Sequence, residues 1–203
     1  LAQAATGTGK TAAFVLPMLH RLHPGGRGNH RTRGLILVPT RELAMQVAEA
    51  VHKYARGSAI SVTPVYGGAP MGQQIRALDR GATIVVATPG RLLDLIDHNA
   101  LSLDGVQTLV LDEADRLLDK GFEDEVQRVL ALLPQRRQTL LLSATFAPGV
   151  EGLAQALLRE PERIGDEQVA GAERVPADCF VLEVCVLRRR IRSARADCEC
   201  AML

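Results

Sequence analysis

Short apolar runs alternate with longer segments of helical periodicity through most of the chain. The runs are rich in Leu, Ile and Val, so we expect strands at residues 35–38, 60–66, 83–87, 108–111 and 139–142, with residues 1–3 as the stub of another. Helical periodicity predicts helices at residues 11–22, 41–54, 71–78, 91–98, 121–133 and 148–158. This alternation is typical of βαβ units and predicts an α/β domain whose parallel sheet carries helices on both faces.

The size and composition of the chain fit one such domain. With 203 residues, 47% of them hydrophobic, the chain is long enough to bury one core, and we place the domain at residues 1–165. The formal net charge of +1 neither supports nor excludes a nucleic-acid partner, which local groups would have to hold. Because we find neither an apolar run that could span a bilayer nor a signal-peptide pattern, we expect no membrane partner and a cytoplasmic, monomeric protein.

Residues 166–203 continue no such alternation and are rich in arginine. They contain Cys179, Cys185, Cys198 and Cys200, whose spacing matches no usual zinc site. Two interpretations stay open, a flexible natural terminus or an artefact of truncation or of a frameshift in GC-rich coding sequence. The first residue is Leu1 rather than methionine, so we also expect the chain to be a fragment.

A glycine-containing segment follows the first apolar run and opens the first expected helix. It reads Ala4-Ala5-Thr6-Gly7-Thr8-Gly9-Lys10-Thr11. Its two glycines let the backbone curl so that successive N–H groups point at one anion, beside the N-terminus of the helix. From Ala5 to Thr11 we therefore expect a phosphate-binding loop, in which Lys10 reaches the β- and γ-phosphates and the Thr11 hydroxyl binds Mg²⁺. The general pattern has glycine where this chain has Ala4.

Acidic residues directly follow the apolar run at 108–111. In Asp112-Glu113-Ala114-Asp115 the first acid is the natural partner of Mg²⁺, usually through water because this ion dehydrates reluctantly. Glu113 can then orient and deprotonate an attacking water molecule. Acids here could instead only cap the next helix, an alternative that the phosphate-binding loop disfavours. We therefore assign catalytic roles to Lys10, Asp112 and Glu113.

Three further segments fall where expected strands end. Thr40 and Thr88 can cap helices whose free N–H groups suit a phosphodiester backbone. Gly67 and Gly68 lack side chains, so a nucleic-acid strand could approach them closely. Such pairs are also ordinary connections between strands and helices, so each segment is ambiguous by itself. Parallel strands end at one edge of a sheet, and we expect these segments and the acids to converge there, where ligands bind in open α/β folds.

Six segments, in order, resemble the motifs of DEAD-box ATP-dependent RNA helicases. They are the phosphate-binding loop, Pro39-Thr40-Arg41-Glu42-Leu43-Ala44, Gly67-Gly68, Thr88-Pro89-Gly90-Arg91, Asp112-Glu113-Ala114-Asp115 and Ser143-Ala144-Thr145. In that family the loop commonly begins with alanine, which accounts for Ala4. The resemblance covers residues 1 to about 165 and implies a truncated RecA-like P-loop NTPase domain that uses ATP and Mg²⁺ and binds RNA.

The resemblance also implies roles for individual residues. Sequence-independent contacts with the RNA backbone are implied for Pro39, Thr40, Arg41, Gly67, Gly68, Thr88, Pro89, Gly90 and Arg91. Hydrogen bonds among Asp115, Ser143 and Thr145 would couple the nucleotide site to strand separation. A second RecA-like domain would complete the ATP site with arginines and form half of the RNA cleft. Neither that domain nor the family's adenine-binding segment lies within the 203 residues, so we expect the chain by itself to be almost inactive.

Two other functions remain open. The domain could hold RNA and nucleotide without turnover, although the presence of Lys10 and Glu113 favours an enzyme. It could also belong to a DNA helicase or translocase with the same core, although the acidic motif and the Pro-Thr-Arg-Glu-Leu-Ala segment favour RNA.

Apolar and aromatic residues outside these motifs are expected to serve packing. One helix is expected to present its packing face through Leu117, Leu118, Phe122, Val126, Val129 and Leu130. For Tyr54 and Tyr66 we expect places in the core or on the surface rather than roles in base stacking.

Overall fold

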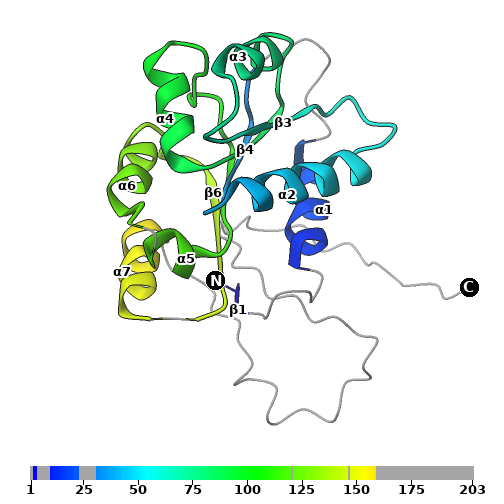
Figure 1. Cartoon of the computed structure of the whole chain (residues 1–203). Helices are drawn as coiled ribbons and strands as arrows, with labels where there is room; N and C mark the ends of the chain where they lie inside the picture. The colour runs from blue at the N-terminus through cyan, green and yellow to red at the C-terminus, as the bar shows by residue number, and fades with distance from the viewer. Residues whose placement is uncertain (1, 4–9, 23–30, 120, 146, 159–203) are drawn as a thin grey trace, which may run out of the picture.

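A computed structural model of the chain describes residues 2–3, 10–22, 31–119, 121–145 and 147–158. Within these ranges the chain forms a sheet with helices packed against it (Figure 1). The sheet has six parallel strands in the order β1-β6-β5-β2-β4-β3. Its strands are β1 (Ala2–Gln3), β2 (Gly34–Leu37), β3 (Val62–Val65), β4 (Ile84–Ala87), β5 (Thr108–Leu111) and β6 (Gln138–Ser143). The parallel sheet predicted from the sequence is confirmed.

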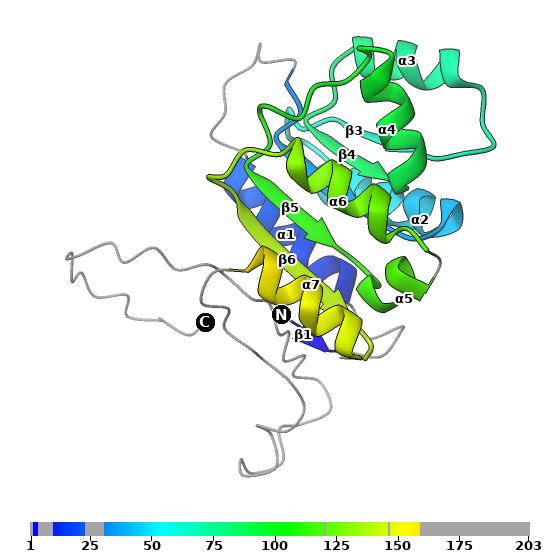
Figure 2. The ribbon, with the colours of Figure 1, turned by 90° about the vertical axis from the view of Figure 1, so that its left-hand side faces the viewer.

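Helices cover both faces of this sheet. Those within the described residues are α1 (Lys10–Leu22), α2 (Arg41–Tyr54), α3 (Met71–Asp79), α4 (Pro89–Asp97), α5 (Ala114–Asp119), α6 (Glu123–Ala131) and α7 (Pro148–Leu157). Helices α1 and α2 pack on one face and α3 to α7 on the other, and Figure 2 shows α4 to α7 in front of the sheet. None of the described helices has the length and apolar character needed to cross a membrane.

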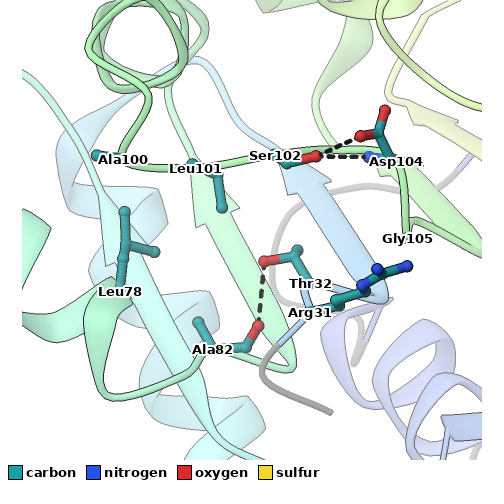
Figure 3. Close-up of a pocket in the computed structure, with 9 residues that line it drawn as sticks. All are labelled: Arg31, Thr32, Leu78, Ala82, Ala100, Leu101, Ser102, Asp104 and Gly105. Carbon is teal, nitrogen blue, oxygen red and sulfur yellow. Dashed lines mark hydrogen bonds between the residues drawn. The ribbon is translucent and has the colours of Figure 1, made fainter.

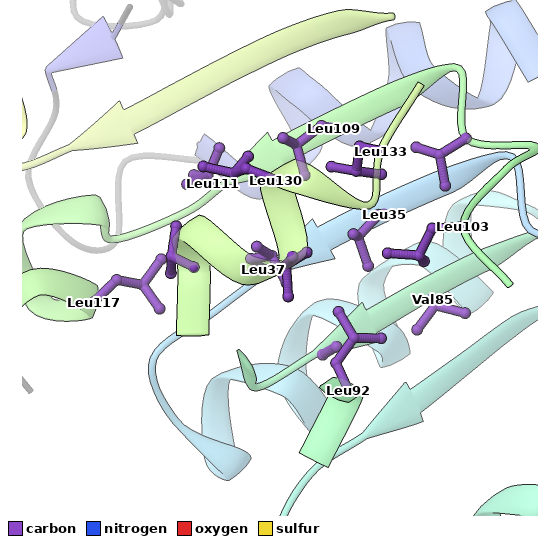
Figure 4. Packing of buried hydrophobic residues seen from close by; sticks show 14 of the residues in the cluster. Leu35, Leu37, Val85, Leu92, Leu103, Leu109, Leu111, Leu117, Leu130 and Leu133 are labelled. Atoms are coloured by element: carbon purple, nitrogen blue, oxygen red, sulfur yellow. The ribbon is translucent and has the colours of Figure 1, made fainter. Parts of the chain in front are cut away.

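Alternate residues in and just after β2 enter separate cores. Leu35 and Leu37 pack with helices α3 to α7, in the cluster that Figure 4 shows, whereas Ile36 and Val38 pack with α1 and α2. All four side chains are fully buried. Burying each of them stabilises the fold by roughly 1.5–3 kcal/mol, so both faces of the sheet need helical cover. This double cover explains why β2, β4 and β5 read as continuous apolar runs.

Most elements lie where the sequence predicts them, with ends that differ by one or two residues. Helix α4 begins earlier than predicted, at Pro89, because proline has no N–H to lose and a suitable φ for the first turn of a helix. The predicted tail at 166–203, with its four cysteines, lies outside the described residues.

One prediction about the helices is wrong. Leu117 and Leu118 do not share a helix with Val126, because α5 and α6 are separate helices. Gly121 separates them with a φ of 73°, which a residue with a side chain adopts only at a cost. Its N–H donates to the Leu118 carbonyl at 2.9 Å, and the Phe122 N–H donates to the Leu117 carbonyl at 3.2 Å. This pair of bonds is a Schellman motif, which ends α5 before α6 begins.

Candidate functional site

The predicted site segments follow the carboxyl ends of neighbouring strands. Backbone hydrogen bonds join these ends across the sheet: the Val38 N–H to the Ala87 carbonyl (2.9 Å), the Thr88 N–H to the Val65 carbonyl (2.9 Å) and the Asp112 N–H to the Leu37 carbonyl (3.0 Å). The predicted convergence at one edge is therefore present in the structure. We call this edge the site edge.

The predicted phosphate-binding loop is only partly described. Ala5, Thr6, Gly7, Thr8 and Gly9 lie outside the described residues, and Lys10 is described only as the first residue of α1. The ends of the loop are fixed by described elements, since β1 ends at Gln3, which pairs with Ser143 of β6, and α1 begins at Lys10. Residues 4–9 therefore connect a strand that pairs with β6 to the first residue of a helix, which is the context that a phosphate-binding loop requires.

Glu113 combines an unusual backbone conformation with an ion pair. Its φ is 50°, in the left-handed region that residues with side chains seldom adopt, and such conformations are frequent at functional sites. Its Oε2 lies 3.0 Å from Arg116 Nη1. Among the described residues, the side-chain bond of Glu113 is made by Oε2 and not by Oε1. The neighbouring Asp112 is buried, with 4% of its surface exposed, and its Oδ1 accepts from the Glu113 N–H at 3.0 Å.

Asp115, Ser143 and Thr145 form a hydrogen-bonded cluster between β5 and β6. Asp115 Oδ2 accepts from both the N–H and the Oγ1 hydroxyl of Thr145, each at 3.1 Å. The Ser143 Oγ accepts from the Asp115 N–H at 3.3 Å and donates to the Thr145 carbonyl at 2.7 Å. The three residues for which the resemblance implied coupling are thus in direct contact.

Asp115 also bonds the first turn of α5, which agrees in part with the alternative interpretation that the acids cap this helix. Asp115 Oδ1 accepts from the Arg116 N–H at 3.0 Å, and Ser143 satisfies the N–H of Asp115. Asp115 therefore serves its own helix with one oxygen and Thr145 with the other. Capping and a role in the site are compatible.

The segment after β2 presents Arg41 beside the two glycines. Thr40 caps α2 as predicted, because its Oγ1 accepts from the Leu43 N–H at 3.1 Å. Arg41 is exposed, and its guanidinium lies 5.5 Å from the centre of the Tyr66 ring, within the range of a cation–π interaction. Gly68 has a φ of 78°, and a Cβ there would lie 3.9 Å from Arg41 Nη1, whereas one at Gly67 would meet nothing within 4 Å. The two glycines therefore have open space on their outer side.

The segment after β4 differs from the prediction in two details. Thr88 is the N-cap residue of α4, but its side chain makes no capping hydrogen bond, so the predicted side-chain cap is absent. Arg91 is not a freely exposed arginine, because only 13% of its side chain is accessible. Its Nη1 donates to the Ala69 carbonyl at 2.8 Å, and its Nε lies 3.5 Å from Asp94 Oδ2. Arg91 thus joins α4 to the chain just after the two glycines.

The sequence reasoning missed the roles of three residues at the site edge. Gln74 bonds the backbone of Tyr66, Tyr66 contacts Arg41, and Arg116 pairs with Glu113. Gln74 is buried, and both ends of its amide bond the backbone of Tyr66. No local pattern marks Gln74 or the contact of Tyr66 with Arg41, since both depend on residues of other elements. Arg116 does have a local signal, because it lies three residues after Glu113, a spacing typical of ion pairs on a helix.

A cavity of about 350 Å³ lies at the opposite edge of the sheet (Figure 3). Its walls include Thr32, Ala82 and Gly105, which come just before β2, β4 and β5, and the Thr32 Oγ1 donates to the Ala82 carbonyl at 3.1 Å. None of the site residues predicted from the sequence lines it. This cavity is therefore not part of the candidate site.

Known proteins resemble the chain in sequence. The model of the DEAD/DEAH box helicase family matches residues 1–153. The ATP-dependent RNA helicase CshA of Listeria monocytogenes is 46% identical over 164 residues, which cover 81% of this chain and 31% of that protein. The RNA helicase CrhR of Synechocystis sp. is 46% identical over 168 residues, which cover 83% and 33%. The chain thus spans about a third of the length of these relatives.

A solved structure shares the fold. The crystal structure of the yeast DEAD-box splicing factor Prp28 superposes with a TM-score of 0.74 at 35% sequence identity. The match covers 78% of this chain and 39% of that one. The predicted α/β fold is thereby confirmed by a solved relative as well as by the strand order.

Proposed function

The chain belongs to the DEAD/DEAH box helicase family, and on that premise we propose that it is the Mg-ATP- and RNA-binding domain of an ATP-dependent RNA helicase. The observation that best supports this proposal is the cluster of Asp115, Ser143 and Thr145, which joins the acidic segment to β6 beside the start of the phosphate-binding loop. We propose that the domain extends to about residue 165 and that the protein works as a monomer in the cytoplasm.

The oxygen donors near the acidic segment fit magnesium. Asp112 offers a carboxylate whose burial limits exchange with solvent, and Thr11 offers a hydroxyl in the first turn of α1. Lys10 and the backbone N–H groups of the loop would hold the phosphates of ATP. When bound, the ion would offset negative charge on the phosphates. Glu113 would accept a proton from the attacking water on Oε1, while Arg116 holds Oε2.

The RNA backbone would lie along the segments that follow β2, β3 and β4. Arg41 supplies an exposed cation, the two glycines leave open space beside it, and the first turn of α4 has no side-chain cap to compete with a phosphate. Pro39, Thr40, Thr88, Pro89 and Gly90 shape this surface. Contacts of these kinds engage phosphates rather than base edges, so binding should be independent of RNA sequence.

Strand separation requires a second domain in this proposal. An arginine contributed across the ATP site by such a domain is typically worth about 10³ to 10⁵ in rate. The 203 residues by themselves should therefore hydrolyse ATP very slowly and should not unwind RNA. Closure of two domains on one RNA strand would also explain how ATP binding drives separation of a duplex.

RNA-stimulated ATP hydrolysis by the full-length protein tests the proposal. We expect single-stranded RNA to raise turnover more than DNA of the same sequence, and Glu113→Gln to abolish turnover while ATP still binds. Stronger stimulation by DNA would assign the domain to a DNA translocase. ATP and RNA binding without turnover in the wild type would leave a binding module.

A further inference from the structure

The two glycines after β3 are held from both sides by side chains of other elements. On one side the Gln74 amide of α3 bonds the backbone of Tyr66, and on the other Arg91 of α4 bonds the Ala69 carbonyl at 2.8 Å. Gly67 and Gly68 lie between these two attachments and have no bulky side chains to restrict them. Their position therefore depends on Gln74 and Arg91.

Gln74 binds Tyr66 in the way that a neighbouring strand would. Its Nε2 donates to the Tyr66 carbonyl at 2.9 Å, and its Oε1 accepts from the Tyr66 N–H at 3.3 Å. Strand β3 is at the edge of the sheet, and the Val65 carbonyl faces β4, where it accepts from the Thr88 N–H. The backbone groups of the next residue, Tyr66, therefore face the open edge, where no strand pairs with them. The pairing also fixes the orientation of the amide, since only one arrangement gives a donor to the carbonyl and an acceptor to the N–H.

Tyr66 in turn supports a cation. The Arg41 guanidinium lies 5.5 Å from the centre of the Tyr66 ring, and Gly67 follows Tyr66 directly. One buried side chain thus fixes a residue that positions both an exposed arginine and the start of the glycine pair. Gln74 itself is 7% exposed and lies behind this surface rather than on it.

We propose that Gln74 is a positioning residue for RNA, which clamps Tyr66 so that Arg41 and Gly67-Gly68 hold one arrangement before RNA binds. The proposal rests on the proposed function, because it assumes that this surface binds RNA. Without the clamp, the binding-competent arrangement becomes one of several, and the apparent affinity for RNA falls in proportion to its population. Bound RNA would restore the arrangement, so turnover at saturating RNA should survive.

The test uses Gln74→Met in the full-length protein, because methionine has a similar length and volume but cannot bond both groups of Tyr66. We expect the RNA concentration for half-maximal ATP hydrolysis to rise about tenfold, if the competent arrangement falls to roughly a tenth of the population. Turnover at saturating RNA and the KM for ATP should change less than about twofold. Gln73→Met is the matched control, since Gln73 is the preceding residue of the same helix and is exposed.

Each outcome of this experiment has a distinct meaning. If the wild type shows no response to RNA, the proposed function fails. If the wild type responds and Gln74→Met behaves like Gln73→Met, the positioning role fails while the proposed function stands. Lower turnover at saturating RNA with an unchanged RNA requirement would mean that Gln74 only stabilises the fold, and would also overturn the role.

A second measurement covers the case in which Gln74→Met does not fold. Amide hydrogen exchange at Tyr66 in the wild type should slow when single-stranded RNA is added, because bound RNA holds the clamped arrangement closed. Two results would contradict the clamp: a Tyr66 amide that is unprotected in the free protein, or an exchange rate at Tyr66 that RNA leaves unchanged.

Discussion

Replacing Glu113 by two different amides should separate backbone strain from chemistry. For residues with a side chain, the left-handed conformation that Glu113 adopts, with a φ of 50°, costs roughly 1–2 kcal/mol. Asparagine tolerates this conformation better, because its short side chain bonds the local backbone. Glutamine has the same side-chain length as glutamate and should leave the backbone strain at residue 113 unchanged. Both amides remove the carboxylate that we assign as the base.

The two variants should therefore differ in stability and not in activity. We expect the free energy of unfolding of Glu113→Asn to be about 1 kcal/mol higher than that of Glu113→Gln, so the asparagine variant should be the more stable of the two. Both weaken the pair with Arg116, whose side chain is 58% exposed, and an exposed pair of this kind contributes only about 0–1 kcal/mol, so the loss nearly cancels in the comparison. Asparagine also gains little as a cap, because the N–H groups of Asp115 and Arg116 already have partners.

Urea unfolding of the two variants and the wild type measures the difference, and ATP hydrolysis by the same preparations measures the chemistry. Turnover should fall at least about 100-fold in both, the usual contribution of a general base. Equal stability of the two variants would show that the backbone at residue 113 stores no strain. Retained turnover in either variant would refute the assignment of Glu113 as the base.

Three further predictions concern single substitutions. Lys10→Ala should weaken ATP binding itself, by about tenfold or more in equilibrium titration, because the phosphates lose a fixed cation; unchanged affinity would argue against the loop. Arg41→Ala should weaken RNA binding equally for different RNA sequences. It should also lower the salt dependence of the binding affinity by the amount expected for about one phosphate contact. A loss of affinity confined to one sequence would indicate base readout instead. Gly121→Ala should lower unfolding stability by roughly 1 kcal/mol, because a Cβ there meets nothing within 4 Å and only the φ of 73° opposes it.

The sequence predicted the strands and the site edge because their physical signals are local. Strands β2, β4 and β5 are buried on both faces, so each is a continuous apolar run that can be recognised without knowledge of its neighbours. Thr40 at the start of α2 is a capping signal of the same local kind. Convergence of the segments then follows from parallel connectivity alone.

Contacts between distant residues were beyond these signals. Arg91 reaches Ala69 across 22 positions, and Asp115 reaches Thr145 across 30, so spacing along one element cannot indicate either contact. The charge of Arg91 suggested a contact with RNA, but in the fold its guanidinium donates to the Ala69 carbonyl. Helix α5 was missed, because it is only six residues long and the helix expected at residues 121–133 begins at the glycine that ends α5.

The strand order divides the site edge into two halves. Strand β1 precedes the predicted phosphate-binding loop, β6 ends at Ser143 and β5 precedes the acids, whereas β2, β4 and β3 precede the segments proposed to bind RNA. The halves meet between β5 and β2, where the Asp112 N–H donates to the Leu37 carbonyl at 3.0 Å within a fully buried ladder. Buried strands packed on both faces cannot shift far without losing contacts on each face. If the proposed function holds, signals between ATP and RNA would therefore be carried better by a second domain that contacts both halves than by movement of this sheet.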